Sequence, residues 1–382
     1  MTARALLLLL LLAASTALAE TNRLVQDLAG GAPVDPELVE RTQASAEDRA
    51  RYFAALGELS AADATKVLRR LAAVDTPAAR GLLAQSGYQA ARSTRLAAIE
   101  VLPEALGTEA ADPLLKLSRA TEFEISEAAI LALGYLKARK AWHTLLTRLQ
   151  WELRNEQDGT SSPPKSGAIV KALATLLGDL QEPALLGTLL DAIPGLDRDY
   201  EREGACLLKV IADSKSPLGV PVLLAVLNDP PRKDMRNSIL EFRWDPETSR
   251  ALERAFGEDG GSLLEVRPLP AEWKALAAQG LGQAGSARAF PFLLRALKHR
   301  DPAVRLAALR ALSPCMLSPR DPQAMHEALD AVIPLLTDAT HPVRNYAWRW
   351  LKRETKQELP LSYPAWRRWN LRRNAKTLAE EQ

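Results

Sequence analysis

The chain has 382 residues, of which 47% are hydrophobic, 5% aromatic and 25% charged, and its formal net charge at pH 7 is +2. A charge this close to zero does not favour a nucleic-acid partner, and we expect none. Leucine and alanine are abundant, whereas β-branched and aromatic runs are few, which favours packed helices over sheets. Composition therefore predicts an all-α protein.

The first 19 residues have the pattern of a secretory signal peptide. A basic Arg4 precedes a ten-residue apolar core, Ala5–Ala14, and the small residues Ala17-Leu18-Ala19 predict cleavage before Glu20. The alternative is an uncleaved anchor, but ten residues cover only about half of a bilayer core. No later segment has the length of a transmembrane helix. We expect an exported protein, periplasmic or extracellular, with no membrane span after cleavage.

Residues 20–93 are predicted to form helices that cap the chain or are degenerate repeats. One helix is expected to begin after Ser45 and another after Ser60, because each serine precedes an acidic first turn and can accept a hydrogen bond from it. A stack of repeats needs such a terminal unit, since its last face would otherwise stay apolar.

One short amphipathic helix recurs along the rest of the chain. In HRDPAVRLAALRALSP (299–314), Asp301 can cap the helix, Pro302 suits its first position and Pro314 ends it. Segments with the same apolar frame recur at intervals of 31 to 44 residues and end at Leu102, Leu133, Leu177, Ile211, Arg243, Leu281, Leu312 and Leu351. The row ending at Arg243 fits least well, because a charge replaces its terminal apolar residue.

A second apolar helix alternates with the first. It is expected at residues 140–149, 183–193, 218–227 and 287–297. Between the two types, Gly134, Gly178 and Gly282 stand near the expected C-caps. A two-helix unit repeated in this way is typical of an α-solenoid, because each unit must bury its apolar stripe on its neighbours.

The segment SARAFPFLLRALKHRDPAVRLAALRALS (286–313) resembles the HEAT repeats of bacterial proteins, in particular the variety called PBS-lyase HEAT-like. The resemblance spans roughly residues 94–353, is strongest over 274–313 and is weaker over 228–272. It implies a right-handed superhelix of helix pairs, about eight repeats long, with the helices of the DPAVR type on its concave side. This architecture serves many binding roles, so it specifies fold better than function.

Enzyme motifs are weak in this chain. GLGQAG (280–285) has the letters of a nucleotide-binding loop but follows a helix where such a loop follows a strand. The four histidines lack the spacing of a metal site. HEAT-like deoxyhypusine hydroxylases bind iron through several His-Glu dipeptides, and this chain has one, His326-Glu327. We expect a non-enzymatic protein with no catalytic residue, cofactor or metal.

The first candidate partner-binding feature is a row of cations seven positions before the helix end points. It consists of Arg236, Lys274, Arg305 and Arg344. A cation in the first turn of a helix opposes the helix dipole, so it needs a local reason. HEAT families often pair such an arginine with an acidic residue of the repeat turns. The acidic residues near the row are Asp234, Glu272, Asp301 and Asp338. We favour this structural ladder over a binding site.

The second candidate is the C-terminal end, where four of the eight tryptophans gather among basic residues. From Val343 to Gln382, ten Lys/Arg face four Glu, a net charge of +6. The candidate binding residues here are Trp348, Arg349, Trp366, Arg367, Arg368, Trp369, Arg372 and Arg373. Tryptophan and arginine are favoured at interface hot spots and by anionic partners. The other interpretation is a final helix that covers the last repeat and exposes its arginines to solvent.

These observations divide the chain into a signal peptide (1–19), N-terminal helices (20–93), a repeat solenoid (94–356) and a basic C-terminal segment (357–382). We predict a scaffold of the cell envelope or extracellular space that binds a protein partner. The alternative is a binder of anionic envelope polymer or lipid head groups through the C-terminal segment.

The two cysteines, Cys206 and Cys315, are predicted to remain free thiols. The repeat frame places them three repeats apart, on the order of 25–30 Å, whereas a disulfide needs Cα atoms within roughly 7 Å. Cys206 falls in an apolar column of its helix, so we expect it to be buried.

Overall fold

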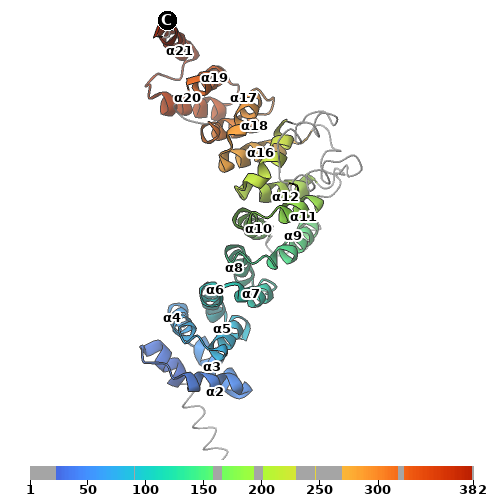
Figure 1. The fold of residues 1–382 in the computed structure, drawn as a ribbon, viewed down its shortest axis with the longest axis vertical. Coiled ribbons are helices and arrows are strands. Elements are labelled where there is room, and N and C mark those ends of the chain that lie inside the picture. The colour runs from blue at the N-terminus through green and yellow to red at the C-terminus, as the bar shows by residue number, and fades with distance from the viewer. Residues whose placement is uncertain are drawn as a thin grey trace, which may run out of the picture. The chain divides into compact units, whose positions relative to one another are not determined.

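A computed structural model describes the following parts of the chain: residues 23–89, 91–157, 166–192, 201–228, 246, 269–316 and 322–380. Within them every regular element is a helix, and no strand occurs (Figure 1). The signal peptide and the row from Arg236 to Arg243 lie outside the described residues. The chain divides into two compact units, Met1–Ala172 and Leu173–Gln382. Each unit is described by itself.

The first unit is a stack of short helices. After helical residues 23–30 come α2 (Pro36–Ala44), α3 (Ala46–Gly57), α4 (Ala61–Ala72), α5 (Pro77–Gln89), α6 (Arg92–Leu106), α7 (Ala111–Leu117), α8 (Phe123–Tyr135) and α9 (Ala141–Gln157). Helices α4, α6 and α8 pack in succession, and α5 and α7 form the facing layer. Buried leucines such as Leu68 and Leu102 fill the space between the layers.

The expected starts of two N-terminal helices are confirmed. The Ser45 hydroxyl accepts from the Asp48 N–H at 3.3 Å, and the Ser60 hydroxyl accepts from the Asp63 N–H at 3.2 Å. Each serine thereby satisfies a first-turn donor that has no partner within its helix.

The second unit continues the same two-layer pattern. Helix α10 (Ser166–Leu180) crosses the boundary and is followed by α11 (Pro183–Asp191), α12 (Glu201–Asp213), α13 (Val220–Asn228), α16 (Ala271–Ala284), α17 (Phe290–Ala296), α18 (Pro302–Ala311), α19 (Pro322–Val332), η6 (Ile333–Thr337), α20 (His341–Thr355) and α21 (Tyr363–Glu380). Helices α12, α16, α18 and α20 pack in succession, and α13, α17 and α19 form the facing layer. This is the α-solenoid arrangement that the repeat pattern predicted.

Helix α16 packs directly against α12 and α13. A Cβ atom added to Gly280 would lie 2.6 Å from the Cα of Ala212, so the two helices approach at backbone contact. The sequence frame has the row ending at Arg243 between them, and that row lies outside the described residues. Helices α12 and α16 are therefore direct neighbours in the stack, whereas the sequence frame predicts one further helix of the same type between them.

The glycines of GLGQAG have packing and capping roles. Gly282 lies inside α16, where an added Cβ would approach the Cα of Ala311 to 2.7 Å. The C-cap is Gly285, which has φ 62° and donates its N–H to the Leu281 carbonyl at 3.1 Å. The expectation of a C-cap at Gly282 is wrong by three residues, because α16 runs on to bury two glycines against neighbouring helices.

Both cysteines are free thiols, as predicted. Cys315 is buried, and its thiol donates to the Leu281 carbonyl at 3.2 Å. Burial raises the pKa of Cys315 to about 12. Cys206 is half-buried, so the expectation that it is fully buried is wrong. Its helix, α12, lies two layers from α18, not three.

Candidate partner-binding surface

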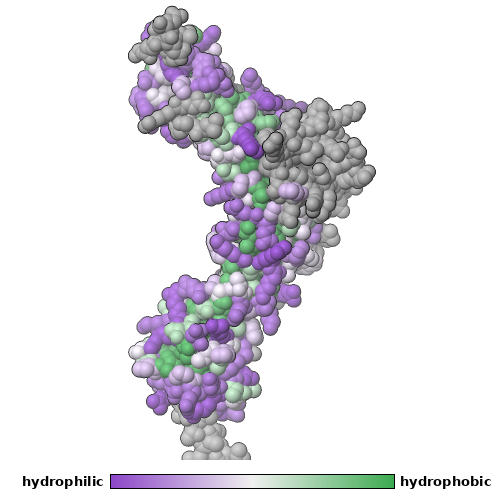
Figure 2. All heavy atoms as spheres, in the orientation of Figure 1, coloured by the Kyte–Doolittle hydropathy of each residue, from purple (hydrophilic) through white to green (hydrophobic). Residues whose placement is uncertain are grey.

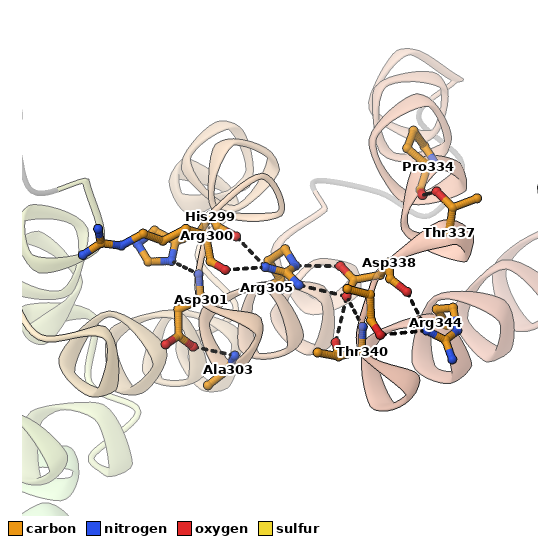
Figure 3. A network of polar contacts seen from close by, with 11 residues as sticks. His299, Arg300, Asp301, Ala303, Arg305, Pro334, Thr337, Asp338, Thr340 and Arg344 are labelled. Carbon is orange, nitrogen blue, oxygen red and sulfur yellow. Dashed lines mark hydrogen bonds and ion pairs between the residues drawn. The ribbon is translucent and has the colours of Figure 1, made fainter.

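Arg305 joins two successive repeats of the second unit. Its Nε and one terminal nitrogen donate to the two carboxylate oxygens of Asp338 at 2.7 and 2.8 Å, and its other terminal nitrogen donates to the carbonyls of His299 and Arg300 at 2.8 Å (Figure 3). Only 13% of the Arg305 side chain and 5% of the Asp338 side chain are exposed. A bidentate pair of this kind, shielded from water, fixes the turn between the repeats.

Asp338 is the centre of this network. Its carboxylate also accepts from the Thr340 N–H at 2.8 Å and from the Thr340 hydroxyl at 2.7 Å. Burial acts to raise the pKa of Asp338, but the bonds from Arg305 and Thr340 outweigh it and hold that pKa below its usual value. The Arg344 guanidinium donates to the carbonyls of Asp338 and Ala339 at 2.6 and 3.0 Å. Two members of the cation row thus stabilise turns.

The same column extends into the first unit. Arg95 lies seven positions before the end point Leu102 and forms an ion pair with Glu122. The Arg95 hydrogen bond is the main reason that the pKa of Glu122 lies below its usual value. The row omits Arg95, although its position in the frame could have identified it. Lys274 is buried, and Arg236 lies outside the described residues.

Three of the four C-terminal tryptophans donate their indole N–H within the fold. Trp348 donates to the Leu359 carbonyl at 2.8 Å, Trp350 to the Ser313 hydroxyl at 2.7 Å, and Trp366 to the Pro360 carbonyl at 2.9 Å. Trp350 and Trp366 are buried, and Trp369 packs edge-to-face on Trp366 with ring centroids 5.7 Å apart. This side of α21 covers the end of the unit, because α21 packs on η6 and the buried Asn370 donates to Asp330 at 2.9 Å.

The other side of α21 is basic and open. Arg367, Arg368 and Arg372 are exposed, and Leu371 between them is 59% exposed. None of these arginines forms an ion pair with a carboxylate in the described part of the chain. Arg373 lies at the edge of this face and is half-buried. The structure therefore shows α21 covering the last repeat with these arginines exposed to solvent, and binding of a partner by them stays a prediction.

A second cluster of arginines surrounds Tyr346 on α20. The guanidinium carbon of Arg310, on α18, lies 5.6 Å from the Tyr346 ring centroid, and that of Arg349 lies 5.9 Å from it. Burial lowers the pKa of Arg353, but the Glu354 carboxylate and the Tyr346 hydroxyl raise it more, so its pKa lies above the usual value. Glu354 also accepts from the Ser313 hydroxyl at 2.8 Å. The cluster consists of Arg310, Tyr346, Arg349 and Arg353, and we call it the Tyr346 cluster.

The Tyr346 cluster adjoins two hollows on the same unit. One is a trough of about 630 Å³ between α16 and α18, whose lining includes Ala275, Leu276, Ala303, Leu306, Ala307 and Arg310. The other is a shallow basic pocket of about 450 Å³, lined by Trp348, Arg349, Lys352, Arg353, Lys356 and Glu358. Figure 2 shows hydrophobic residues at the surface near α16 and α18, between hydrophilic ones.

Sequence reasoning identified Trp348 and Arg349, and the basic C-terminal end it singled out contains Lys352 and Arg353, but it missed Arg310 and the trough. A signal for it exists, because Gln279, Arg310 and Arg349 all stand two positions before a helix end point. Residues in one column of successive layers lie side by side once those layers pack. The column was not visible as a site without knowing that α16, α18 and α20 are neighbours.

The described residues hold no group of three or more His, Cys, Asp or Glu side chains that could bind a metal ion. Of the helices that the structure describes, none combines the length and apolar character needed to cross a bilayer.

The stacked helix pairs define the class of protein, an α-helical repeat protein. Residues 267–352, in its second unit, match the family model described as HEAT repeats. Comparison with curated protein sequences gives no significant match.

Solved structures similar to the chain include an engineered protein (18% identity, 88% of this chain and 99% of that one, TM-score 0.25). Human deoxyhypusine hydroxylase in complex with glycerol is also similar (15%, 91% and 99%, TM-score 0.26). A second engineered protein matches at 17% identity over 76% of this chain and 96% of that one, with TM-score 0.29.

Proposed function

We propose that the chain is a non-enzymatic scaffold, exported to the periplasm or beyond, that binds a protein partner. The observation that carries the proposal is the division of its arginines. Some, such as Arg305, form ion pairs that join successive repeats. Arg310 and Arg349 instead face solvent beside an apolar trough, and neither has a carboxylate partner among the described residues. An exposed surface with both apolar and cationic parts has the composition of a recognition site.

A protein partner is tested by capture from envelope extract with the full chain after signal-peptide cleavage. We expect one or a few proteins to be retained, and each is then purified and its affinity remeasured against the chain alone. Capture at low and high salt separates the contribution of charged contacts from that of apolar contacts, because exposed charge contacts weaken as the Debye length shrinks. Failure of every captured protein to bind in the purified system would contradict the scaffold role.

A second candidate function, binding of anionic envelope polymer or lipid head groups, is supported by the open side of α21. Arg367, Arg368 and Arg372 stand around the exposed Leu371 on this helix. Cations next to an exposed apolar side chain suit an anionic interface. The test is sedimentation with vesicles of anionic and of zwitterionic lipid, using the full chain and the Arg367→Glu/Arg368→Glu variant. Equal binding of both proteins to anionic vesicles would exclude this helix as the contact.

Export is tested by tagging the chain at its C-terminus and fractionating cells. We expect the tag in the exported fraction, with the mature chain starting at Glu20 on N-terminal sequencing. A tagged chain that keeps its first 19 residues in the cytoplasmic fraction would contradict the signal-peptide prediction.

A further inference from the structure

The free side of α16, α18 and α20 changes from apolar to basic along the stack. Half of the residues that line the trough between α16 and α18 are alanine or leucine. Gly282 and Ala311, where these helices approach at backbone contact, both line this trough. At the α20 side the trough gives way to Arg310, Tyr346 and Arg349, and then to the basic pocket.

We infer that this surface, formed by the trough, the Tyr346 cluster and the basic pocket, binds a segment of a protein partner in which small apolar residues stand next to Asp or Glu. This inference rests on the proposed scaffold function and names the chemistry of its partner. We call this surface the α16–α20 surface.

The charge of the surface selects an acidic segment. Arg310 and Arg349 have no carboxylate partner in the part of the chain that the structure describes. Both guanidinium groups lie over the Tyr346 ring, which restricts the rotamers of the two arginine side chains. Less rotamer entropy is therefore lost when a carboxylate binds. Glu354 does not neutralise them, because it is held by Ser313 and Arg353. Of the residues that line the trough, Glu272 is acidic. It lies in the first turn of α16, whereas Arg310 lies in the last turn of α18.

The trough selects a protein over a simple polyanion. A polyphosphate or a lipid head group would engage the arginines but leave the apolar hollow of about 630 Å³ in contact with water. A peptide can fill it with alanine, valine or leucine while its neighbouring carboxylates reach the arginines. Apolar burial near 25 cal/mol per Å² then adds to the charge contacts. The combined surface therefore binds a segment with both apolar residues and carboxylates more tightly than a segment with only one of them.

The test begins with selection of random peptides displayed on phage against the full chain. We expect enriched peptides to place Asp or Glu next to small apolar residues. The affinity of a labelled enriched peptide is then measured by fluorescence anisotropy against three variants. Arg310→Glu/Arg349→Glu reverses the charge, Ala307→Trp fills the trough, and Arg367→Glu/Arg368→Glu makes the same charge change on α21 as a matched control.

The charge-reversal and trough variants are each expected to weaken binding at least about tenfold, because like-charge contacts and steric exclusion both oppose the segment. The control is expected to change it less than about twofold at physiological salt, because Arg367 and Arg368 line neither the trough nor the basic pocket and exposed charges outside a contact are screened. Circular dichroism and thermal unfolding confirm that each variant is folded. Failure to enrich any peptide, enriched peptides without acidic residues, or unchanged binding to the charge-reversal variant each overturns the inference. Loss of binding in the control variant instead moves the site to α21.

The outcome is separable from that of the scaffold proposal. A partner confirmed in the purified system that binds the Arg310→Glu/Arg349→Glu variant normally would refute this surface and leave the scaffold role intact. Peptides that bind the surface as described, with no partner found in the envelope, would support the surface and contradict the scaffold role.

Discussion

Removing the Asp338 carboxylate should destabilise the second unit more than removing an exposed acidic partner elsewhere. In Asp338→Ala, Arg305 loses both of its hydrogen bonds to the carboxylate. In the native protein only 13% of the Arg305 side chain is exposed. Leaving a shielded charge without its partner costs roughly 3–5 kcal/mol, and we take about 2–3 because Arg305 keeps two carbonyl bonds. Loss of the bonds from Thr340 resembles loss of a helix cap and adds about 1 kcal/mol. The expected total is about 3–4 kcal/mol.

The assay is urea unfolding followed by tryptophan fluorescence, since the buried Trp350 reports on the second unit and the buried Trp142 reports on the first unit, which holds the control. Glu100→Ala is the matched control, because Glu100 pairs with Arg69 at 2.9 Å but both side chains are more than half exposed. Exposed pairs contribute about 0–1 kcal/mol. A double-mutant cycle between Arg305→Ala and Asp338→Ala isolates the coupling. Equal effects of Asp338→Ala and Glu100→Ala, or a coupling near zero, would show that the ladder does not hold the repeats together.

The same carboxylate should make the unit sensitive to acid. The pKa of Asp338 is held below its usual value in the folded state, so the folded state binds fewer protons there than the unfolded chain. The stability it contributes is fully present above the unfolded pKa, near 4, and is lost as pH falls through the folded pKa. Asp338→Asn should therefore flatten the dependence of unfolding free energy on pH below about 4. An unchanged acid limb in urea titrations across that range would contradict this reasoning.

Three further predictions concern packing. Gly282→Val should lower the free energy of unfolding by about 1–3 kcal/mol, because the added side chain forces α16 away from α18. Gln283→Ala, a change at the exposed neighbouring residue, should have little effect. Similar melting curves for the two variants would refute the close contact. Alkylation of the native protein should label Cys206 before Cys315, whose pKa burial raises to about 12, and mass spectrometry should find two labels per chain in denaturant without reductant. A linked peptide pair would contradict it. Trp366→Ala should cost about 3–5 kcal/mol because this buried indole fixes α21 to the last repeat, and a neutral effect on urea unfolding would argue against the covering role.

Deleting residues 357–382 would be a poor probe of binding for the same reason. The deletion removes Trp366 and Asn370, which are buried, together with the open arginines of α21. Loss of partner capture would then have two causes. Charge reversal at Arg367 and Arg368 changes the exposed side alone and keeps the covering contacts.

The sequence by itself determined which segments are helices and that they stack as repeats. Apolar residues at helical spacing, an Asp-Pro start and a period of 31 to 44 residues are local signals, and each remains valid whatever the neighbours are. The caps at Ser45 and Ser60 belong here, because each serine accepts from an N–H three residues later in its own helix.

Tertiary structure decided which layers are neighbours and which residues of the frame remain open. The contact of α16 with α12 could not be predicted from spacing, because the chain between them is long enough for another repeat. The same packing separates arginines of similar sequence context: Arg305 is drawn into a turn by Asp338, whereas Arg310, five residues later, lies over Tyr346 in the next layer. Successive residues of a helix point about 100° apart, so one column faces a turn and another faces solvent. Only the stacked neighbour determines whether a column becomes a structural contact or a surface for a partner.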